Sequence, residues 1–385
     1  MKSHSDFQPT QTRNALLGNS TKFASLFEGG QEKEKTWSKQ VTRYWLQSLA
    51  KELLPKESRI GVCMHCLSPV ATGVDVMKHP ESTRAYYSGL MVCGMIWVCA
   101  VCASRITEER RQELTRALEV TGLTPYLVTY TLRHKRSDSL KTLTEAMQNA
   151  FRFMKSGKYW GYLTEEYGWI GSIKSLEVTH GDNGWHPHQH ELVLLDASLS
   201  KSAQAGLLSD LRLKWGKALS RRGFDASWDR GVDLRATSED VQDYVAKFGH
   251  QPITMNWSIE HELTKQPVKR GKNGGRTPAQ LLSDYGMGDI QAARLWREYA
   301  RVFKGKKQLV WSKGLRGLLG VGMELADSEI AGSIPPGAEI LARLSSIEWK
   351  AILKADLRGE LLDAASTMEM AQFRRWLSEK LEKWL

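Results

Sequence analysis

The sequence predicts an α+β fold in which a central, largely antiparallel sheet is flanked by helices. Segments with strand character are interspersed with amphipathic helical segments through the middle of the chain, and two of the strands are joined by GDNG, a composition typical of a β-hairpin. All five cysteines fall within residues 63–102, ahead of the strand-rich region. At 385 residues, with 41% hydrophobic and 25% charged side chains, the composition is that of a globular protein with two or three domains.

The N-terminal part predicts an arm followed by a helix. Residues 1–40 are polar and weakly patterned, and residues 37–54 have helical character. The first residues lack the apolar core of a signal peptide, and no apolar run approaches the roughly 18 residues that span a bilayer. We therefore expect a cytoplasmic protein with no membrane partner.

The cysteines form two CxxC pairs, in CMHC and in CGMIWVCAVC. In a reducing compartment such pairs favour tetrahedral thiolate coordination of Zn²⁺, with Cys63, Cys66, Cys99 and Cys102 as the expected ligands. Cys93 could replace one of the first pair, because the second segment alone offers three thiolates. Four thiolates leave no open position, so this zinc would be structural. The alternative is a cluster of buried free cysteines.

The remaining elements follow from hydrophobic periodicity, capping residues and turn composition. In order, we expect a helix at 104–120, a strand at 125–133, a helix at 137–157 opened by Ser137 or Asp138, strands at 171–180 and 185–195, a helix at 201–223 ending at Gly223, a strand at 228–236, and a helix at 238–250 capped by Ser238.

The C-terminal third predicts a linker and then helices. Residues 264–277 are basic, rich in glycine and without hydrophobic periodicity, which is typical of a linker. The expected organisation is an arm and helix at 1–58, a cysteine region and helix at 59–120, a sheet domain at 121–263, the basic linker at 264–277 and a helical region at 278–385.

The balance of charge favours a polyanionic partner. The chain has 54 Lys and Arg against 43 Asp and Glu, a formal charge of +11. Nucleic acid is the simplest such partner, because phosphate contacts supply most of its non-specific affinity for proteins. A solvated basic surface without a partner is the alternative.

The segment WHPHQHELVLL at 185–195 places three histidines at every second position. In a strand, His186, His188 and His190 project from one face. Glu177 precedes the hairpin turn, so its carboxylate can face these imidazoles from the neighbouring strand. Two histidines and a carboxylate leave open positions on a divalent cation. His186 precedes Pro187 and is assigned a supporting role or a DNA contact. Inert histidines on a half-exposed strand are the alternative.

A second group of chemically capable side chains lies in the helix predicted at 238–250. Asp240, Tyr244 and Lys247 stand at i, i+4 and i+7 and share one helical face. A tyrosine with a carboxylate and an ammonium nearby could act as a nucleophile. A core tyrosine beside a surface charge pair is the alternative.

Together these segments resemble a known family. PHQH, TYTLRH and DYVAK are similar to the three motifs of the HUH endonucleases, specifically the single-tyrosine rolling-circle replication initiators (Rep proteins) of small bacterial plasmids. CGMIWVCAVCASRI, RTPAQLLSDY, LWREYARVFKG and QLVWSKGL also resemble members of this group, so the likeness spans roughly residues 60–325. It implies a ferredoxin- or RRM-like sheet and metal-dependent nicking of one origin strand, which leaves a 5′-phosphotyrosine, a free 3′-hydroxyl and the capacity to rejoin the strand.

The resemblance implies roles for matching residues. His188 and His190 would bind Mg²⁺ or Mn²⁺, Tyr244 would be the nucleophile and Lys247 the lysine of the Y-x-x-K pattern. Glu177 is our inferred third ligand, on strand geometry. Gln189 stands where the family usually has a bulky hydrophobe, so either the opposite face is locally polar or the strand has a different register.

Related initiators use a glutamate four residues before the tyrosine to activate water, and this chain has Asp240 there, with Glu239 as the other candidate. The expected partners are plasmid origin DNA, single-stranded at the nick, and host helicase and polymerase. The residues expected to contact this DNA are Arg133, His134, Lys135, Trp185 and His186.

Two other functions are consistent with parts of the sequence. A non-catalytic zinc-knuckle DNA-binding regulator explains the charge and the cysteines but does not explain why the three motifs occur together. A relaxase or single-strand transposase would share the chemistry. Relaxases, however, often carry an N-terminal tyrosine, whereas Tyr244 lies 54 residues after His190.

Overall fold

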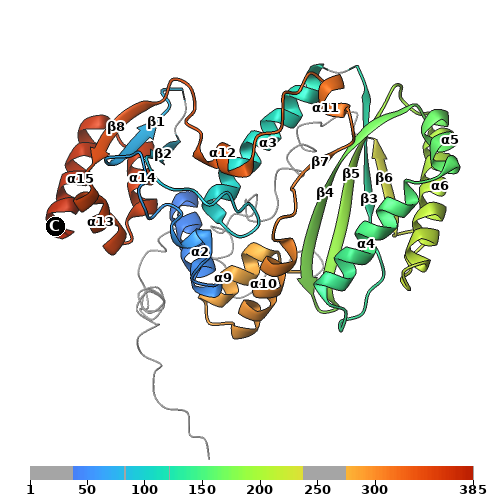
Figure 1. Ribbon diagram of the computed structural model, residues 1–385, viewed down its shortest axis with the longest axis horizontal. Coiled ribbons are helices and arrows are strands. Elements are labelled where there is room, and N and C mark those ends of the chain that lie inside the picture. The colour runs from blue at the N-terminus through green and yellow to red at the C-terminus, as the bar shows by residue number, and fades with distance from the viewer. Residues whose placement is uncertain (1–37, 82–83, 121, 237–274, 385) are drawn as a thin grey trace, which may run out of the picture.

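The computed structural model describes residues 38–81, 84–120, 122–236 and 275–384. In these ranges the strands form a five-stranded sheet of order β6-β3-β5-β4-β7 and a three-stranded sheet of order β2-β1-β8, with helices between and around them (Figure 1). This confirms the α+β class with antiparallel sheets. None of the helices in these ranges is both long and apolar enough to cross a bilayer.

The five-stranded sheet is built around the predicted hairpin. Strands β4 and β5 pair from Trp169↔Leu195 to Gly181↔Gly184, and every pairing within this sheet is antiparallel. Gly184 follows the two-residue turn with φ +86°, in the left-handed region that favours glycine. The strands are β3 (Thr124–Tyr130), β4 (Trp169–Gly181), β5 (Gly184–Leu195), β6 (Val232–Ala236) and β7 (Val310–Trp311).

Helices α4 (Leu140–Met154) and α6 (Lys201–Ser220) pack on one face of this sheet, with α5 (Lys158–Glu166) beside them (Figure 1). Tyr130 of β3 makes ring contacts there with Phe151 of α4 and Trp215 of α6, at centroid distances of 5.5 and 5.2 Å. Helix α4 begins after Ser139, whose hydroxyl accepts a hydrogen bond from the Thr142 backbone. The cap predicted at Ser137 or Asp138 was therefore wrong by one or two residues.

The opposite face of the sheet is apolar at one end. Leu192 and Leu194 of β5 pack there with side chains from α3 (Ala100–Val120), from α11 (Leu315–Leu318) and from the residues just before β7 and just after α11. Even-numbered residues of β5 share this face, so the three histidines continue the same surface towards the hairpin turn.

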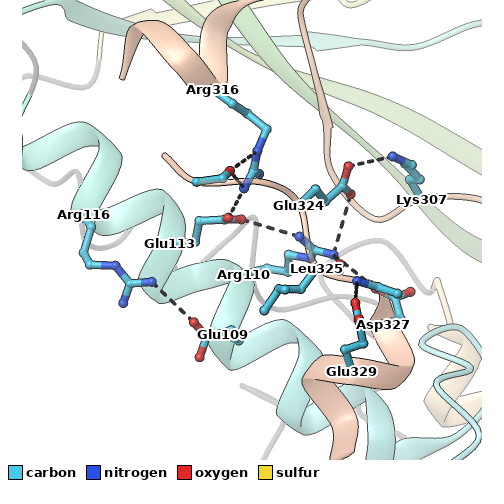
Figure 2. Close-up of polar contacts among 12 residues, drawn as sticks. Glu109, Arg110, Glu113, Arg116, Lys307, Arg316, Glu324, Leu325, Asp327 and Glu329 are labelled. Carbon is cyan, nitrogen blue, oxygen red and sulfur yellow. Dashed lines mark hydrogen bonds and ion pairs between the residues drawn. The ribbon is translucent and has the colours of Figure 1, made fainter. Parts of the chain in front are cut away.

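Helix α3 is tied to the chain between residues 307 and 329 by a network of charged groups (Figure 2). The Arg110 side chain is 8% exposed and lies within 3.4–3.6 Å of carboxylate oxygens of Glu113, Glu324 and Asp327. Arg110 also donates to the Leu325 carbonyl at 2.7 Å, and Arg316 donates to Glu113. This network fixes the segment after α11 along α3.

The second sheet joins distant parts of the chain. Strand β1 (Val74–Lys78) pairs with β2 (Ala85–Ser88) on one side and with β8 (Glu339–Leu344) on the other. An ion pair between Asp75 and Arg343, at 2.7 Å, reinforces the second pairing. Sequence analysis missed all three strands and predicted a C-terminal region of helices alone. The strands are short, and β8 has its partner far away in the sequence.

The helices beside this sheet bring the two ends of the described chain together. Helix α2 (Lys39–Leu53), predicted at 37–54, packs against α14 (Arg358–Thr367) and α9 (Pro278–Gly286). The approach of α2 to α14 is close, because a Cβ on Gly359 would lie 2.5 Å from Val41 Cα. The other helices here are α10 (Ile290–Phe303), α12 (Asp327–Gly332), α13 (Ser346–Lys354) and α15 (Met370–Trp384).

Part of the predicted linker at 264–277 belongs to this ordered structure. Arg276 forms a two-way backbone bridge with His180 at the end of β4, and Thr277 caps α9 with a capping box. Residues 264–274 lie outside the described residues, as do Ser238, Glu239, Asp240, Tyr244 and Lys247.

Candidate active site and metal centres

The three histidines of β5 lie on one face, as their spacing predicts. His190 is opposite Ser175 of β4 and Thr129 of β3, while His188 is opposite Glu177 and His186 is opposite Thr179. Cross-strand partners project from the same face of an antiparallel sheet. The register therefore brings Glu177 onto the histidine face beside His188 and His190.

His190 is held from both sides. Its Nε2 lies 2.8 Å from a carboxylate oxygen of Glu177, and its Nδ1 lies 3.1 Å from the Thr129 hydroxyl. About a quarter of each side chain of this Glu177–His190 pair is exposed, so solvent reaches the pair. The ring orientation of His190 is consequently fixed at a position that a ligand can reach.

His188 lies between the other two histidines. Its ring is nearly parallel to that of His190, with centroids 6.1 Å apart, and is 4.3 Å from that of His186. Its Nδ1 is buried and has no hydrogen-bond partner within the described structure. Burial, and to a lesser extent the charge of His186, lower the pKa of His188 to about 4. The imidazole is thus neutral at physiological pH, the form that binds metals.

The loop after β3 contributes a further histidine. His134 Nε2 lies 2.7 Å from His186 Nδ1, and burial together with His134 lowers the pKa of His186. The neighbouring Arg133 and Lys135 are exposed, and Arg133 is 3.5 Å from a carboxylate oxygen of Asp225. These two cations therefore lie at the surface beside the histidine face.

Trp185 does not lie on this surface. Its side chain is 3% exposed, and its indole N–H donates to Glu298 of α10 at 3.0 Å. The other carboxylate oxygen of Glu298 accepts from the Leu140 backbone at the start of α4. The predicted contact between Trp185 and DNA is therefore corrected to a packing role that joins the hairpin to α4 and α10.

The donor types on the histidine face fit a divalent cation. Glu177, His188 and His190 combine a carboxylate with neutral imidazoles and leave coordination positions open, and His188 offers a buried nitrogen without a partner. Their donor atoms are less compact than those of the cysteines described below: Glu177 contacts His190 directly, but the ring centres of His188 and His190 are 6.1 Å apart.

The unusual Gln189 is explained by a locally polar opposite face, the first of the two alternatives above. Its buried side-chain amide donates to the Ser175 carbonyl at 2.7 Å and to the His190 carbonyl at 3.1 Å. Two residues further on, the fully buried Glu191 carboxylate accepts from Lys155 and from the Tyr130 hydroxyl. Sequence analysis missed Lys155 and Glu191, although a glutamate before the apolar run LVLL was the available signal.

Four cysteines form a compact, buried cluster. The Sγ atoms of Cys63, Cys93, Cys99 and Cys102 all lie within 4.8 Å of one another, with separations of 3.5, 3.6 and 3.8 Å among the closest. A zinc tetrahedron with Zn–S bonds of about 2.3 Å has S···S edges of about 3.8 Å. The cluster therefore fits a metal such as zinc. Within the described residues it is the one group of histidine, cysteine and acidic side chains this compact.

One predicted zinc ligand is replaced. Cys66 is exposed, and Cys93 occupies the fourth position of the cluster, which is the alternative that the sequence left open. The backbone explains the exchange, because Met91 N–H donates to the Cys66 carbonyl and Met64 N–H donates to the Met91 carbonyl. This pairing brings the chain before Cys93 against the first CxxC segment.

Side chains from distant helices surround the cluster. Gln47 of α2 is buried and donates to Cys99 Sγ at 3.3 Å, and its carbonyl oxygen accepts from Arg358 of α14 at 3.0 Å. Arg105 is a second largely buried cation beside the thiols. Four thiolates around a Zn²⁺ ion would carry a net charge of −2, which these guanidinium groups would offset. No local motif around Arg358 revealed this role.

The chain is similar to proteins from Streptomyces. It is 28% identical over 371 aligned residues to a Streptomyces lividans protein named Protein rep, in an alignment that covers 77% of this chain and 79% of that protein. It is also 33% identical over 135 residues to a neomycin resistance protein of Streptomyces cyanogenus, which covers 28% of this chain and 31% of that protein. No protein-family model and no solved structure matches.

Proposed function

We propose that this chain is a plasmid rolling-circle replication initiator that nicks one DNA strand at the origin. The observation that carries the proposal is the direct contact of Glu177 with His190, beside a neutral His188, on a solvent-accessible part of the sheet. Similarity to Protein rep over most of the chain and the net charge of +11 support the same reading.

In this proposal the Tyr244 oxygen attacks the scissile phosphate. A tyrosine O–P bond forms, the P–O3′ bond breaks and the leaving 3′ oxygen takes up a proton, which produces a 5′-phosphotyrosine and a free 3′-hydroxyl. The reverse attack by a 3′-hydroxyl rejoins the strand without an external energy source, because the phosphotyrosine keeps the energy of the cleaved bond. Lys247 offsets phosphate charge, and Asp240 or Glu239 activates water for release of the protein.

Glu177, His188 and His190 would hold the Mg²⁺ or Mn²⁺. When bound, this ion supplies neutralisation of the charge on the scissile phosphate and fixes the geometry of that phosphate. The chain's own contribution is orientation. Thr129 holds one ring nitrogen of His190, so the other nitrogen points towards Glu177. Burial keeps His188 neutral and able to bind a metal.

The remaining parts of the proposal concern binding and location. The cysteine cluster holds a structural Zn²⁺ that orders α2, α3 and α14 around it. Arg133, His134 and Lys135, next to the histidine face, contact origin DNA that is single-stranded at the nick. A host helicase unwinds the duplex, a host polymerase extends the 3′-hydroxyl, and the protein works in the cytoplasm.

The test is nicking of supercoiled DNA that carries the cognate origin, with Mn²⁺ or with EDTA. The wild type should nick only with the metal and remain covalently attached to the 5′ end. Tyr244→Phe and the double variant His188→Ala/His190→Ala should each lose both activities. His79→Ala is the matched control, because His79 lies next to β1 in the other sheet.

The outcomes separate the rival functions. A wild-type protein that binds the origin but nicks it with no divalent metal would overturn the proposal in favour of a zinc-knuckle DNA-binding regulator. Loss of nicking in His79→Ala to the same extent as in the double variant would remove the special role of β5. Cleavage and joining of single strands without any origin-dependent replication in cells would favour a relaxase or a transposase.

A further inference from the structure

A basic pocket lies on the sheet face opposite the histidines. Its volume is about 510 Å³, and it opens between α4, β4 and the segment that precedes β7. Apolar side chains, including Phe151, Leu176 and Val310, form part of its wall. Its polar lining consists of Gln148, Arg152, Lys155, Lys174, Ser175, Gln189, Lys306 and Lys307.

Two of the five cations in this pocket have carboxylate partners. Lys155 is paired with the buried Glu191, and Lys307 lies 2.6 Å from Glu324. In the described part of the chain, no carboxylate lies within ion-pair distance of Arg152, Lys174 or Lys306. The pocket's cations therefore outnumber the carboxylates near them, although Glu191 acts on Lys174 and Glu145 on Lys306 from beyond ion-pair distance.

Lys174 is a partly buried member of this group. It projects from β4 with its Nζ 4.9 Å from the centre of the Phe151 ring, and Lys155 Nζ lies 4.7 Å from the same centre. Burial lowers the pKa of Lys174, and the charges of Lys155 and Arg152 lower it further, against the opposing effect of Glu191. An anion between these cations would relieve both the repulsion and the loss of solvation.

We propose that this pocket binds a phosphate group, with Arg152, Lys174 and Lys306 as its charged ligands. Guanidinium and ammonium groups are the usual protein partners of phosphate, and the amide of Gln148 can donate as well. The apolar wall suits the sugar or base that a nucleotide carries next to its phosphate. The phosphate can come from a free nucleotide or from a DNA backbone. Because the pocket lies across the sheet from His188, the proposal does not depend on the nicking chemistry.

Calorimetric titration of the full chain at low salt tests the proposal with inorganic phosphate, thymidine monophosphate and a short oligothymidylate. The variant is Arg152→Gln/Lys174→Gln. The matched control is Lys141→Gln/Lys158→Gln, which removes the same charge from exposed positions on α4 and α5. Because the variant loses two charge-assisted contacts, it should bind at least about tenfold more weakly than the control.

The two phosphate sources give different patterns. If the site takes a free nucleotide, thymidine monophosphate binding falls and oligothymidylate binding does not. If it takes a DNA backbone, oligothymidylate binding falls, and the slope of log affinity against log salt decreases by about 0.7 for each lost contact. Either pattern supports the pocket.

Equal binding of all three ligands by the variant and the control would overturn the proposal, as would a wild type that binds none of them. Arg152→Gln alone guards against a folding artefact, because Arg152 is exposed and its replacement leaves the core intact. This single variant should still bind the preferred ligand several-fold more weakly than Lys141→Gln does.

Discussion

The buried pair between Lys155 and Glu191 allows a quantitative test of the electrostatics beneath the histidine strand. Glu191 has no exposed surface, and its carboxylate accepts hydrogen bonds from Lys155 and from the Tyr130 hydroxyl at 3.2 Å. Lys155 also donates to Ser172 Oγ at 3.2 Å. Lys155→Met keeps the aliphatic part of the side chain and removes the ammonium, which leaves the buried carboxylate without its hydrogen-bonded counter-charge and with only the more distant Lys174 as a nearby cation.

Breaking a buried ion pair by removing one partner costs about 3–5 kcal/mol, because the remaining charge is uncompensated. We therefore expect Lys155→Met to lower the free energy of unfolding by about 3 kcal/mol or more, a large part of the 5–15 kcal/mol typical of a domain. The double variant Lys155→Met/Glu191→Leu removes both charges. It should retain only the cost of a stranded Tyr130 hydroxyl, about 1–3 kcal/mol.

Urea denaturation followed by circular dichroism measures these changes, with Lys158→Met, an exposed lysine at the start of α5, as the control. The control should stay within about 0.5 kcal/mol of the wild type. A loss below about 1 kcal/mol in Lys155→Met, or a double variant no more stable than the single one, would refute the reasoning. Either result would mean that Glu191 is not held as a buried anion.

Three further predictions concern other parts of the molecule. Cys93→Ser should lose bound zinc and unfold at a lower temperature, whereas Cys66→Ser should keep one zinc per chain. Metal analysis of the purified proteins measures the zinc content of each variant. Zinc retention in Cys93→Ser would contradict the observed cluster. Arg110→Met should free residues 319–329 from α3, so that a protease cleaves this segment faster than in the wild type. Unchanged cleavage would show that Arg110 is not needed to hold the segment on α3. Gly184→Ala should lower the free energy of unfolding by about 1–3 kcal/mol, because the residue has a positive φ and the added Cβ would lie 3.1 Å from the Arg136 carbonyl oxygen. A melting temperature equal to that of the wild type would contradict this turn geometry.

The hairpin could be predicted from the sequence because its signals are local. The period-two histidines determine which side chains share a face, and GDNG marks the turn, so the pairing of Glu177 with the histidine face followed from strand geometry alone. The choice between Cys66 and Cys93 could not be made in the same way. Both have suitable spacing, and the backbone pairing around Met91 that selects Cys93 depends on how the two cysteine segments meet.

The missed features depend on contacts between distant residues. The segment at 339–344 lies among helical sequences, and its strand conformation depends on pairing with β1. Arg358 similarly acquires a role only because α14 packs on α2 near the cysteines. Hydrophobic periodicity reports on the local face of an element and not on its partner, so such contacts lie beyond it. Tyr244 and its helix lie outside the described residues and stay a prediction.

The pairing of β1 with β8 has a consequence for the order in which a ribosome releases the chain. Asp75 and Arg343 are 268 residues apart, so at about 5–20 residues per second the ribosome synthesises β8 about 13–54 seconds after β1. During that interval one edge of the β1–β2 hairpin is open, and Arg358 has not yet arrived beside the cysteines. A translation product that stops early therefore keeps an exposed strand edge, which invites aggregation or degradation. The cysteine region can therefore complete its contacts only after β8 and α14 have been synthesised.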